Sequence, residues 1–543
     1  MPTLEWIGKD KVINHHAQVP FRMLEKKYTY NAEESENMII RGDNLEALKA
    51  LLPRYEGKIK CIYIDPPYNT GNEGWVYNDN VNDPHIKKWL GEVVGKEGED
   101  LSRHDKWLCM MYPRLKLLHK LLSEDGAIFI SIDDSELVYL SCICDEIFGT
   151  RNYVDRIVDR ITVIVKTEGR RYGNFAKTHE NILVYAKQLD LFLANEIEVE
   201  GKEYQYKDEC GGFNLKGLRN RNVRAFNSAN RPNLRYPFYV DVRNPDNNGL
   251  WKVNTSPKSG WEEVWAQTVD GLESVWRWGK EKSTLQASDL CAYRGKDGQI
   301  RIFQKERKLT ETAKTVWIDK KFTSIFGTKE IQQILGKSVF DFPKSISLIQ
   351  QIMNIATNKN AIILDSFAGS GTTAHAVLNL NKSDGGNRRF ILVEMNDYAE
   401  SITAERVKRV IDGYGEGKNT AEGTGGDFSF YDLGEPLLID GIYLNANVGT
   451  EKIREYVWFT ETGKPVPEIT SANEYYLGEN NSCSYYFYYE KNSVTTLNDT
   501  FLATVDIKSD EYVIYADKCV LSDEYLAAKN ITFKKIPRDI SKI

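Results

Sequence analysis

An apolar run that ends in an acidic residue constrains this chain more than any other feature. Residues 60–64 are mostly apolar, as in a strand of a parallel sheet that is buried on both faces, and Asp65-Pro66-Pro67-Tyr68 follows at once. Open α/β sheets hold ligands at the carboxyl ends of their strands. The tetrapeptide is therefore predicted to belong to a ligand site, although Asp-Pro and Pro-Pro are also common in ordinary turns.

Each residue type in this tetrapeptide has a chemical use at such a site. The Asp65 carboxylate can accept a hydrogen bond from an exocyclic amine, and the prolines fix the backbone so that nearby carbonyls keep set directions. The Tyr68 ring can stack on a flat base. This combination favours methylation of an amino nitrogen on a nucleobase. The predicted catalytic residues are Asp65, Pro66, Pro67 and Tyr68.

A second candidate site lies far downstream. Residues 362–364 predict a buried strand, which the sequence DSFAGSG at 365–371 joins to a helix. Glycines let the backbone approach a ligand, and the start of a helix offers unpaired N–H groups. Glu394 ends the next predicted strand, where an acid commonly binds ribose hydroxyls. This half of the chain is predicted to bind a nucleoside-bearing cofactor.

The glycine pattern alone does not identify that cofactor. Gly369-x-Gly371-x-x-Ala374 also fits the NAD fingerprint in its alanine form, so a dinucleotide and S-adenosylmethionine both remain open, beside a plain glycine-rich turn. The pattern is not a P-loop, because no lysine follows the second glycine. The upstream tetrapeptide favours S-adenosylmethionine, because it suits methylation of an amino group and has no use in a dehydrogenase.

Composition limits the class of protein. A chain of 543 residues is too long for one core, and 41% hydrophobic with 27% charged residues is typical of a soluble globular protein. The formal net charge of −7 means that any site for nucleic acid must be local. The eight cysteines form no CxxC pair, which argues against a metal site or a disulfide framework and fits the cytoplasm. No apolar run predicts a signal peptide or a membrane span.

Local patterns predict the order of the elements. Residues 38–40 predict a strand, followed by a helix that Asp43 or Asn44 would cap. Further strands are expected at 58–64, 126–132, 362–364 and 389–393, and helices at 84–92, 104–122, 135–147, from 372 to about 380, and 399–411. The loop at 69–74 could close over a ligand.

The chain divides into five predicted regions. Residues 37–150 and 336–412 would be the two halves of one α/β core, of which the first carries the catalytic motif and the second the cofactor motif. The other regions are an N-terminal arm at 1–36, an insert at 151–335 that is rich in aromatic and basic residues, and a C-terminal α+β or β-rich domain at 427–543.

The insert is the natural place for reading a nucleic acid. Its stretch from Asn214 to Arg235 has several basic residues and no acidic one, and a smaller basic pair lies upstream. Lysine and arginine contact phosphates, and arginine also reads guanine. The alternative is a solvated basic loop. The candidate DNA-binding residues are Arg170, Arg171, Lys216, Arg219, Arg221, Arg224, Arg231 and Arg235.

Together these motifs resemble a known family. IDPPYNTG at 64–71 and DSFAGSGTT at 365–373 resemble amino-directed DNA methyltransferases, in the circularly permuted β-group order. GDNLEAL at 42–48, FDFPKS at 340–345 and ITAERVKRV at 402–410 are also similar to that family. The chain is closer still to the modification subunits of type III restriction–modification systems, through RPNLRYPFYV at 231–240, WRWGKEK at 276–282, IREYVWFTETG at 453–463 and VTTLNDTFLATV at 494–505.

The resemblance implies a fold and a role for single residues. The fold would be a Rossmann-like, S-adenosylmethionine-dependent methyltransferase α/β fold with permuted motifs, an inserted target-recognition domain and a C-terminal α+β domain. Asp65, Pro66 and Tyr68 would hold the target adenine. The residues Asp365, Phe367, Gly369, Gly371 and Thr372 would line the S-adenosylmethionine site, with Glu394 on the ribose, Lys344 near the methionine end and Asp43 near the cofactor adenine.

The resemblance also implies a substrate and partners. It implies N6-methylation of an adenine that is flipped out of duplex DNA, a homodimer, and a separate restriction subunit that carries helicase and nuclease. Cytosine N4, RNA or a protein amide remain alternative targets. A DNA-binding specificity subunit without activity is the non-enzymatic alternative, and an NAD enzyme is the weakest one.

Overall fold

The structure is a computed structural model that consists of two compact units. One unit comprises Met1–Asn195 with Ala313–Ile543, and the other comprises Glu196–Thr312. Each unit has its own sheet and its own hydrophobic core. The described residues are 3–69, 103–152, 160–166, 170–172, 175–199, 201, 203–337, 339–415, 417, 420–439, 443–445, 447–464, 467, 473–537 and 539–540.

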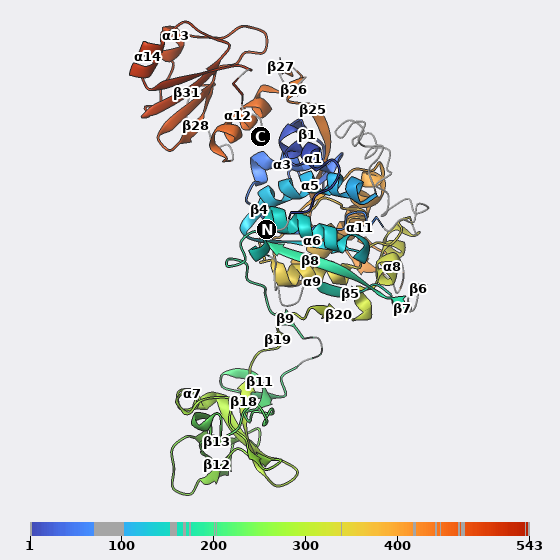
Figure 1. Ribbon diagram of the computed structural model, residues 1–543, viewed down its shortest axis with the longest axis vertical. Helices are drawn as coiled ribbons and strands as arrows, with labels where there is room; N and C mark the ends of the chain where they lie inside the picture. Colours follow the sequence, from blue (N-terminus) through green and yellow to red (C-terminus); the bar gives the residue numbers. More distant parts are fainter. Residues whose placement is uncertain are drawn as a thin grey trace. The chain divides into compact units, whose positions relative to one another are not determined.

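A ten-stranded sheet forms the centre of the first unit (Figure 1). Its order is β1 (Arg22–Tyr30), β25 (Phe428–Pro436), β2 (Met38–Arg41), β22 (Arg389–Glu394), β21 (Ile362–Asp365), β3 (Ile59–Ile64), β4 (Leu122–Ile132), β8 (His179–Ala186), β5 (Ile161–Ile164) and β20 (Val316–Trp317). The strands from β2 to β4 run parallel and are almost entirely buried, as the apolar runs predict. All five strands expected for the α/β core are therefore confirmed.

Strands β3 and β21 are neighbours although they lie far apart in the sequence. Ile363 pairs with Cys61, and Leu364 pairs with Ile62. Because the pairing is parallel, the carboxyl ends of both strands meet at one edge of the sheet. Asp65 and Asp365 follow directly at this edge, so the two motifs of the sequence come together.

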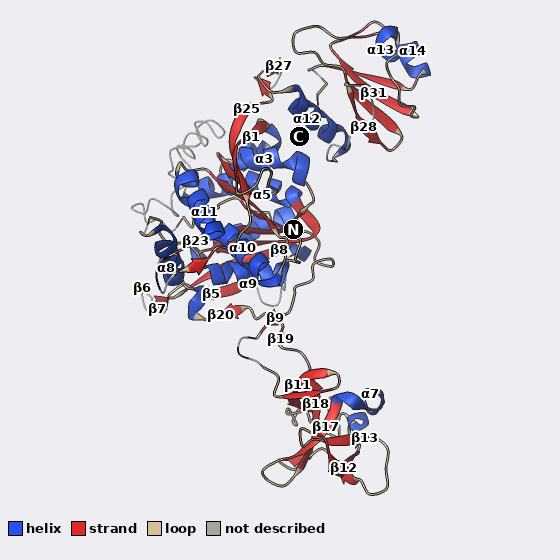
Figure 2. Ribbon diagram, turned by 180° about the vertical axis from the view of Figure 1, so that it is seen from behind, coloured by secondary structure: helices blue, strands red, loops and turns tan. Residues whose placement is uncertain are grey.

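Helices cover both faces of the sheet. Figures 1 and 2 view the molecule from opposite sides, and helices of both layers are labelled in each. The first layer contains α3 (Asn44–Tyr55), α5 (Arg103–Leu121) and α6 (Asp134–Phe148), and the second contains α9 (Ile346–Ala356), α10 (Thr372–Asp384) and α11 (Glu405–Asp412). A π-helical segment at Ala399–Ala404 leads into α11. The expected helices at 104–122, 135–147, 372–380 and 399–411 are thus confirmed.

Local capping explains where several of these helices begin. The Asp43 carboxylate accepts hydrogen bonds from the backbone N–H groups of Leu45 and Glu46, and Asp133 caps α6 in the same way through Ser135. Helix α10 begins after Gly371, which has a left-handed backbone with φ of 78°. The expected cap at Asp43 is confirmed, and α3, α6 and α10 all begin at the carboxyl edge of the parallel strands.

The N-terminal region is part of the sheet rather than a separate arm. Strand β1 pairs antiparallel with β25 at the edge of the sheet, and Tyr28 stacks on Phe430 with ring centroids 5.3 Å apart. The polar and aromatic texture of residues 1–36 hides this role, because an edge strand keeps one side in water. The helix expected at 84–92 and the loop expected from 70 to 74 lie outside the described residues.

The separate unit within the insert covers fewer residues than the sequence indicates, Glu196–Thr312 instead of 151–335. Strand β8 pairs antiparallel with β4, and β5 and β20 continue the same sheet, so residues on both sides of Glu196–Thr312 belong to the first unit. The second unit is a seven-stranded sheet of β10 (Tyr206–Asp208), β11 (Gly211–Gly217), β18 (Ile300–Glu306), β17 (Leu290–Arg294), β13 (Trp251–Asn254), β12 (Phe238–Pro245) and β14 (Glu262–Val264).

The C-terminal region forms a small sheet of its own. Its strands are β28 (Tyr476–Asn480), β29 (Cys483–Phe487), β31 (Glu511–Ala516) and β33 (Ile531–Lys535), accompanied by α12 (Thr450–Thr462), α13 (Asp499–Leu502) and α14 (Asp523–Ala528). The region therefore mixes helices and strands, as expected. No helix in the described ranges is long and apolar enough to cross a membrane.

Helix α8 (Ser324–Leu335) approaches the backbone that precedes α9 very closely. A Cβ atom at Gly327 would lie 2.1 Å from the carbonyl oxygen of Pro343 and 2.8 Å from that of Lys344. Both atoms belong to the backbone, so the segment itself would have to move. Glycine at this position therefore places the segment that carries Lys344 at the edge of the sheet.

We expect Gly327→Ala to lower the free energy of unfolding by about 1–3 kcal/mol, because the added methyl group overpacks this contact. Urea unfolding followed by circular dichroism measures the change. Lys329→Ala, at an exposed position of the same helix, is the control and should change the free energy by less than about 0.5 kcal/mol. Equal stability of Gly327→Ala and the wild-type protein would contradict the close approach.

Candidate active site

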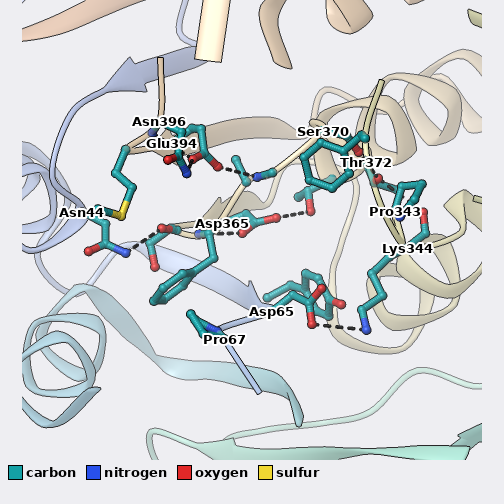
Figure 3. Close-up of a pocket in the computed structure, with 18 of the residues that line it drawn as sticks. Asn44, Asp65, Pro67, Pro343, Lys344, Asp365, Ser370, Thr372, Glu394 and Asn396 are labelled. Carbon is teal, nitrogen blue, oxygen red and sulfur yellow. Dashed lines mark hydrogen bonds and ion pairs between the residues drawn. The ribbon is translucent and has the colours of Figure 1, made fainter. Parts of the chain in front are cut away.

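A cavity of about 200 Å³ opens where β3 and β21 end (Figure 3). Figure 3 shows Glu394 and Asn396 at one side of this cavity, Asp65 and Lys344 at another, and Asp365 between them. The sequence-predicted residues that line it are Asp65, Pro67, Lys344, Asp365, Phe367, Gly369, Thr372 and Glu394. The fold thus brings most of the catalytic and cofactor candidates to one place.

The glycine-rich loop forms one wall of the cavity. Gly369 has a left-handed backbone with φ of 51°, and a Cβ atom there would lie 2.9 Å from the Phe340 ring. The Thr403 hydroxyl donates a hydrogen bond of 2.6 Å to the Gly369 carbonyl. Gly371, two residues further along the loop, is the N-cap residue of α10. The loop is therefore a fixed backbone cradle at the start of a helix, which suits a polar ligand.

Glu394 closes one end of this cradle. Its side chain accepts hydrogen bonds from the backbone N–H groups of Gly369, at 2.8 Å, and Asn396, at 3.0 Å. Burial raises the pKa of Glu394 to about 7. A carboxylate in this position retains acceptor capacity for the hydroxyl groups of a ribose.

Asp365 holds the loop rather than projecting freely. One carboxylate oxygen accepts from the Phe367 N–H at 3.0 Å, and the other accepts from the Thr373 hydroxyl at 2.6 Å. Burial raises the pKa of Asp365 to about 7 as well. Its contacts tie the end of β21 to the first turn of α10, so the shape of the cradle depends on it.

Asp65 presents a largely buried acceptor to the cavity. Its side chain is 13% exposed, and the Lys344 ammonium lies 3.2 Å from Oδ1. That oxygen is buried, and its contact with Lys344 is an ion pair. Burial raises the pKa of Asp65, Lys344 acts in the opposite direction, and the charge of Glu180 raises it further. Such an oxygen is suited to an incoming N–H donor.

The two prolines and Tyr68 follow this aspartate at the end of β3. The Trp107 indole donates a hydrogen bond of 2.6 Å to the Pro67 carbonyl, which fixes the turn after β3. Pro66 is buried and, like Tyr68, is not part of the cavity wall. The Tyr68 hydroxyl instead donates to Glu180 at 2.9 Å.

Glu180 is a residue of the site that the sequence reasoning missed. It lies on β8 and is 5% exposed, and the Lys344 ammonium lies 2.8 Å from each of its carboxylate oxygens. Burial lowers the pKa of Lys344, but the charges of Asp65 and Glu180 raise it by more. The signal in the sequence is one acid within the apolar run HENILVYA at 179–186, because such an acid is seldom buried without a partner.

The Asp43 carboxylate is already engaged by other residues of the protein. Besides capping α3, it lies 3.3 Å from the Arg114 guanidinium, and it does not line the cavity. Its neighbour Asn44 does line the cavity and donates to the Ser366 carbonyl at 3.2 Å. Asn44, and not Asp43, therefore lines the cavity beside the glycine cradle. The sequence reasoning considered Asn44 only as a helix cap.

The candidate DNA-binding residues differ in their surroundings. In the second unit, Arg235 donates to the carbonyls of Ala266 and Ser274, and Lys216 pairs with Glu306. Arg219 is half-buried, whereas three other arginines are exposed, namely Arg221, Arg224 and Arg231. Arg170 and Arg171 lie in the first unit, in strand β6 (Arg170–Tyr172), which pairs with β7 (Phe175–Lys177).

Known proteins share this sequence over much of its length. A family model described as DNA methylase matches residues 59–405. The EcoPI Mod subunit, a type III restriction–modification enzyme of Escherichia phage P1, is 34% identical over 73% of this chain and 64% of its own length. The type II methyltransferase M.KpnI of Klebsiella pneumoniae is 34% identical over 69% of this chain and 84% of its own length.

Among solved structures, the cytosine-N4-specific PvuII DNA methyltransferase covers 68% of this chain at 10% identity and a TM-score of 0.35. The sheet topology and the family match define the fold. This chain spans less than two thirds of the EcoPI Mod subunit, with 64% covered. The match at 59–405 includes both strand ends that meet at the cavity. The chain belongs to the DNA methylase family of N6- and N4-directed methyltransferases.

Proposed function

We propose that this protein is a sequence-specific DNA methyltransferase that transfers a methyl group from S-adenosylmethionine to N6 of adenine in duplex DNA. One observation carries the proposal: Asp65, whose carboxylate is held by the Lys344 ammonium, lines the same cavity as the glycine cradle and Glu394. An acceptor for an amino group and a cradle for a nucleoside thus lie side by side. Family membership and the M.KpnI relative support the same reaction class.

The residues of the cradle fit S-adenosylmethionine. Glu394 would hold the ribose, Gly369 and the start of α10 would lie against the polar backbone of the cofactor, and Phe367 would cover its base. When bound, the cofactor supplies an electrophilic methyl group on a positively charged sulfur. The carboxylates that surround the cavity favour such a cation.

Asp65 would prepare the amino group for reaction. The lone pair of an adenine N6 is delocalised into the ring, so the nitrogen is a weak nucleophile. Asp65 accepts one N–H hydrogen bond and the Pro66 carbonyl accepts the other, which favours a pyramidal nitrogen with its lone pair toward the methyl group. Positioning and fixed charges thus supply most of the rate gain.

The target base has to leave the DNA stack to reach Asp65. Tyr68 would then pack against the flipped-out base and offset part of the unstacking. The exposed Arg221, Arg224 and Arg231 of the second unit would contact the DNA backbone or read bases. These roles make the second unit the target-recognition module, with Arg170 and Arg171 as further contacts.

The resemblance to type III modification subunits supports a wider assembly. The protein would act as the modification subunit of a restriction–modification system in the cytoplasm, as a homodimer, with a separate restriction subunit as partner. The EcoPI Mod relative is named as the subunit of such an enzyme. The C-terminal region is the candidate surface for these contacts.

We expect Asp65→Ala to lower the rate of methyl transfer at least about 1,000-fold, because the acceptor for the amino group is lost. Incorporation of a labelled methyl group into DNA from a strain without adenine methylation measures the rate, and sequencing of modified bases gives the site. The dissociation constant for S-adenosylmethionine should stay within about threefold. Asp190→Ala, at an exposed position, is the control. Full activity of Asp65→Ala would refute the assignment.

We expect S-adenosylmethionine to bind more weakly as the pH falls. The pKa of about 7 for Glu394 means that acid adds a proton and removes an acceptor for the ribose hydroxyls. The dissociation constant should rise about tenfold between about pH 8 and about pH 6. Isothermal titration calorimetry measures it. Glu394→Gln should bind weakly at both pH values with a flatter dependence, whereas the exposed Glu422→Gln should match the wild type.

We expect the double variant Arg221→Ala with Arg224→Ala to bind duplex DNA more weakly, because exposed arginines release counterions when they contact phosphates. The slope of log affinity against log salt should fall by about two. Fluorescence anisotropy with labelled duplex DNA measures both quantities. Arg301→Ala, whose guanidinium already pairs with Asp297 at 2.5 Å, is the control. An unchanged salt slope in the double variant would exclude these contacts.

A further inference from the structure

Three ionisable side chains from separate parts of the chain meet at one side of the cavity, which Asp65 and Lys344 line. Asp65 follows β3, Glu180 lies on β8, and Lys344 precedes α9. The Lys344 ammonium lies 3.2 Å from Asp65 and 2.8 Å from both oxygens of Glu180 (Figure 3 shows its link to Asp65). The Tyr68 hydroxyl donates to Glu180 and accepts from Lys344 at 2.5 Å.

This arrangement is not balanced in charge. Two carboxylates share one ammonium group, and the side chains of Asp65, Glu180 and Lys344 are only 13%, 6% and 13% exposed. An extra buried charge lowers stability when no second cation offsets it, so its presence here points to a role other than stability. The titratable groups that face Asp65 from the surrounding elements are Lys344, Glu180, Tyr68, Tyr63 and Asp365.

We propose that Glu180 is a positioning residue of the methyl-transfer site, which holds Lys344 and Tyr68 so that Asp65 can receive the proton that the methylated nitrogen releases. This inference rests on the proposed function. Glu180 would hold Lys344 and Tyr68 in place, and it belongs neither to the glycine cradle nor to the catalytic tetrapeptide. It also places the side chain of Lys344 at the amino-group end of the cavity, while its backbone carbonyl faces Thr372 at 3.3 Å.

The reaction balances with Asp65 as the proton acceptor. The nitrogen lone pair forms the new N–C bond, and the electrons of the S–C bond return to sulfur. The nitrogen then carries a positive charge, and the electrons of one N–H bond return to it as the proton passes to the Asp65 carboxylate. The products are N6-methyladenine, S-adenosylhomocysteine and a protonated Asp65, which returns its proton to water after product release.

The surroundings of Asp65 tune this step. Burial raises the pKa of Asp65, Lys344 lowers it and Glu180 raises it again. Without the negative charge of Glu180, the lysine would depress the proton affinity of Asp65 unopposed. Glu180 therefore keeps Asp65 able to act as a base while Lys344 holds it in place.

The test is the pH dependence of a single turnover. We expect Glu180→Gln to slow methyl transfer about 10- to 100-fold, with the dissociation constant for S-adenosylmethionine within about threefold of the wild-type value. The acid limb of its pH–rate profile should move to lower pH by about one unit, because the lost charge no longer raises the pKa of Asp65. Rapid quench with a labelled methyl group and DNA from a strain without adenine methylation measures the rates.

Two further variants separate charge from packing. Glu180→Asp keeps the charge but shortens the side chain, so it should lose rate and keep the wild-type acid limb. It also serves if Glu180→Gln fails to fold. Glu146→Gln is the matched control, because Glu146 likewise accepts from a lysine and a tyrosine, Lys9 at 3.0 Å and Tyr112 at 2.7 Å. It lies near the end of α6, does not line the cavity, and should leave rate and profile unchanged.

The outcomes distinguish the two proposals. No methyl transfer by the wild-type protein would overturn the proposed function and this inference with it. An active wild-type protein, with a wild-type rate and acid limb in Glu180→Gln, would overturn the inference alone. The same shift of the acid limb in Glu180→Gln and Glu180→Asp would also overturn it, because the shift would then come from packing and not from charge.

Discussion

The parallel pairing of β21 with β3 is the interaction on which the rest of the structure depends. Its register, with Leu364 opposite Ile62, decides where each strand ends along the sheet. A slip by one residue would turn one strand's side chains to the opposite faces and separate Asp365 from Asp65. The helical layers on both faces prevent this slip, because each buries the apolar side chains that point toward it.

The two sides of the cavity treat their acids differently. Asp365 and Glu394 are satisfied by backbone N–H groups and a hydroxyl, so they shape the cradle. Asp65 and Glu180 instead compete for Lys344, which leaves negative charge near the amino-group end. In the proposed reaction positive charge moves from sulfur to nitrogen, and fixed negative charge at that end favours the transition state.

The second unit is inserted into the chain without interrupting the parallel core. The chain leaves the sheet after β8 and returns at β20, and both strands lie on the side of β4 away from the cradle strands. The parallel core between β2 and β4 therefore stays intact. A separate sheet of seven strands belongs to the second unit, which also carries the exposed arginines Arg221, Arg224 and Arg231.

The sequence by itself determined the strands and helices of both motifs, because apolar runs, the cap at Asp43 and the left-handed Gly371 are local signals. It also indicated the family, because the two motifs need no distant partner to be recognised. Only the tertiary structure decided that Glu180 meets Asp65 and Lys344, and that Arg235 is engaged by carbonyls while Arg221 is exposed. Contacts of this kind depend on the order of strands in a sheet, which local patterns do not encode.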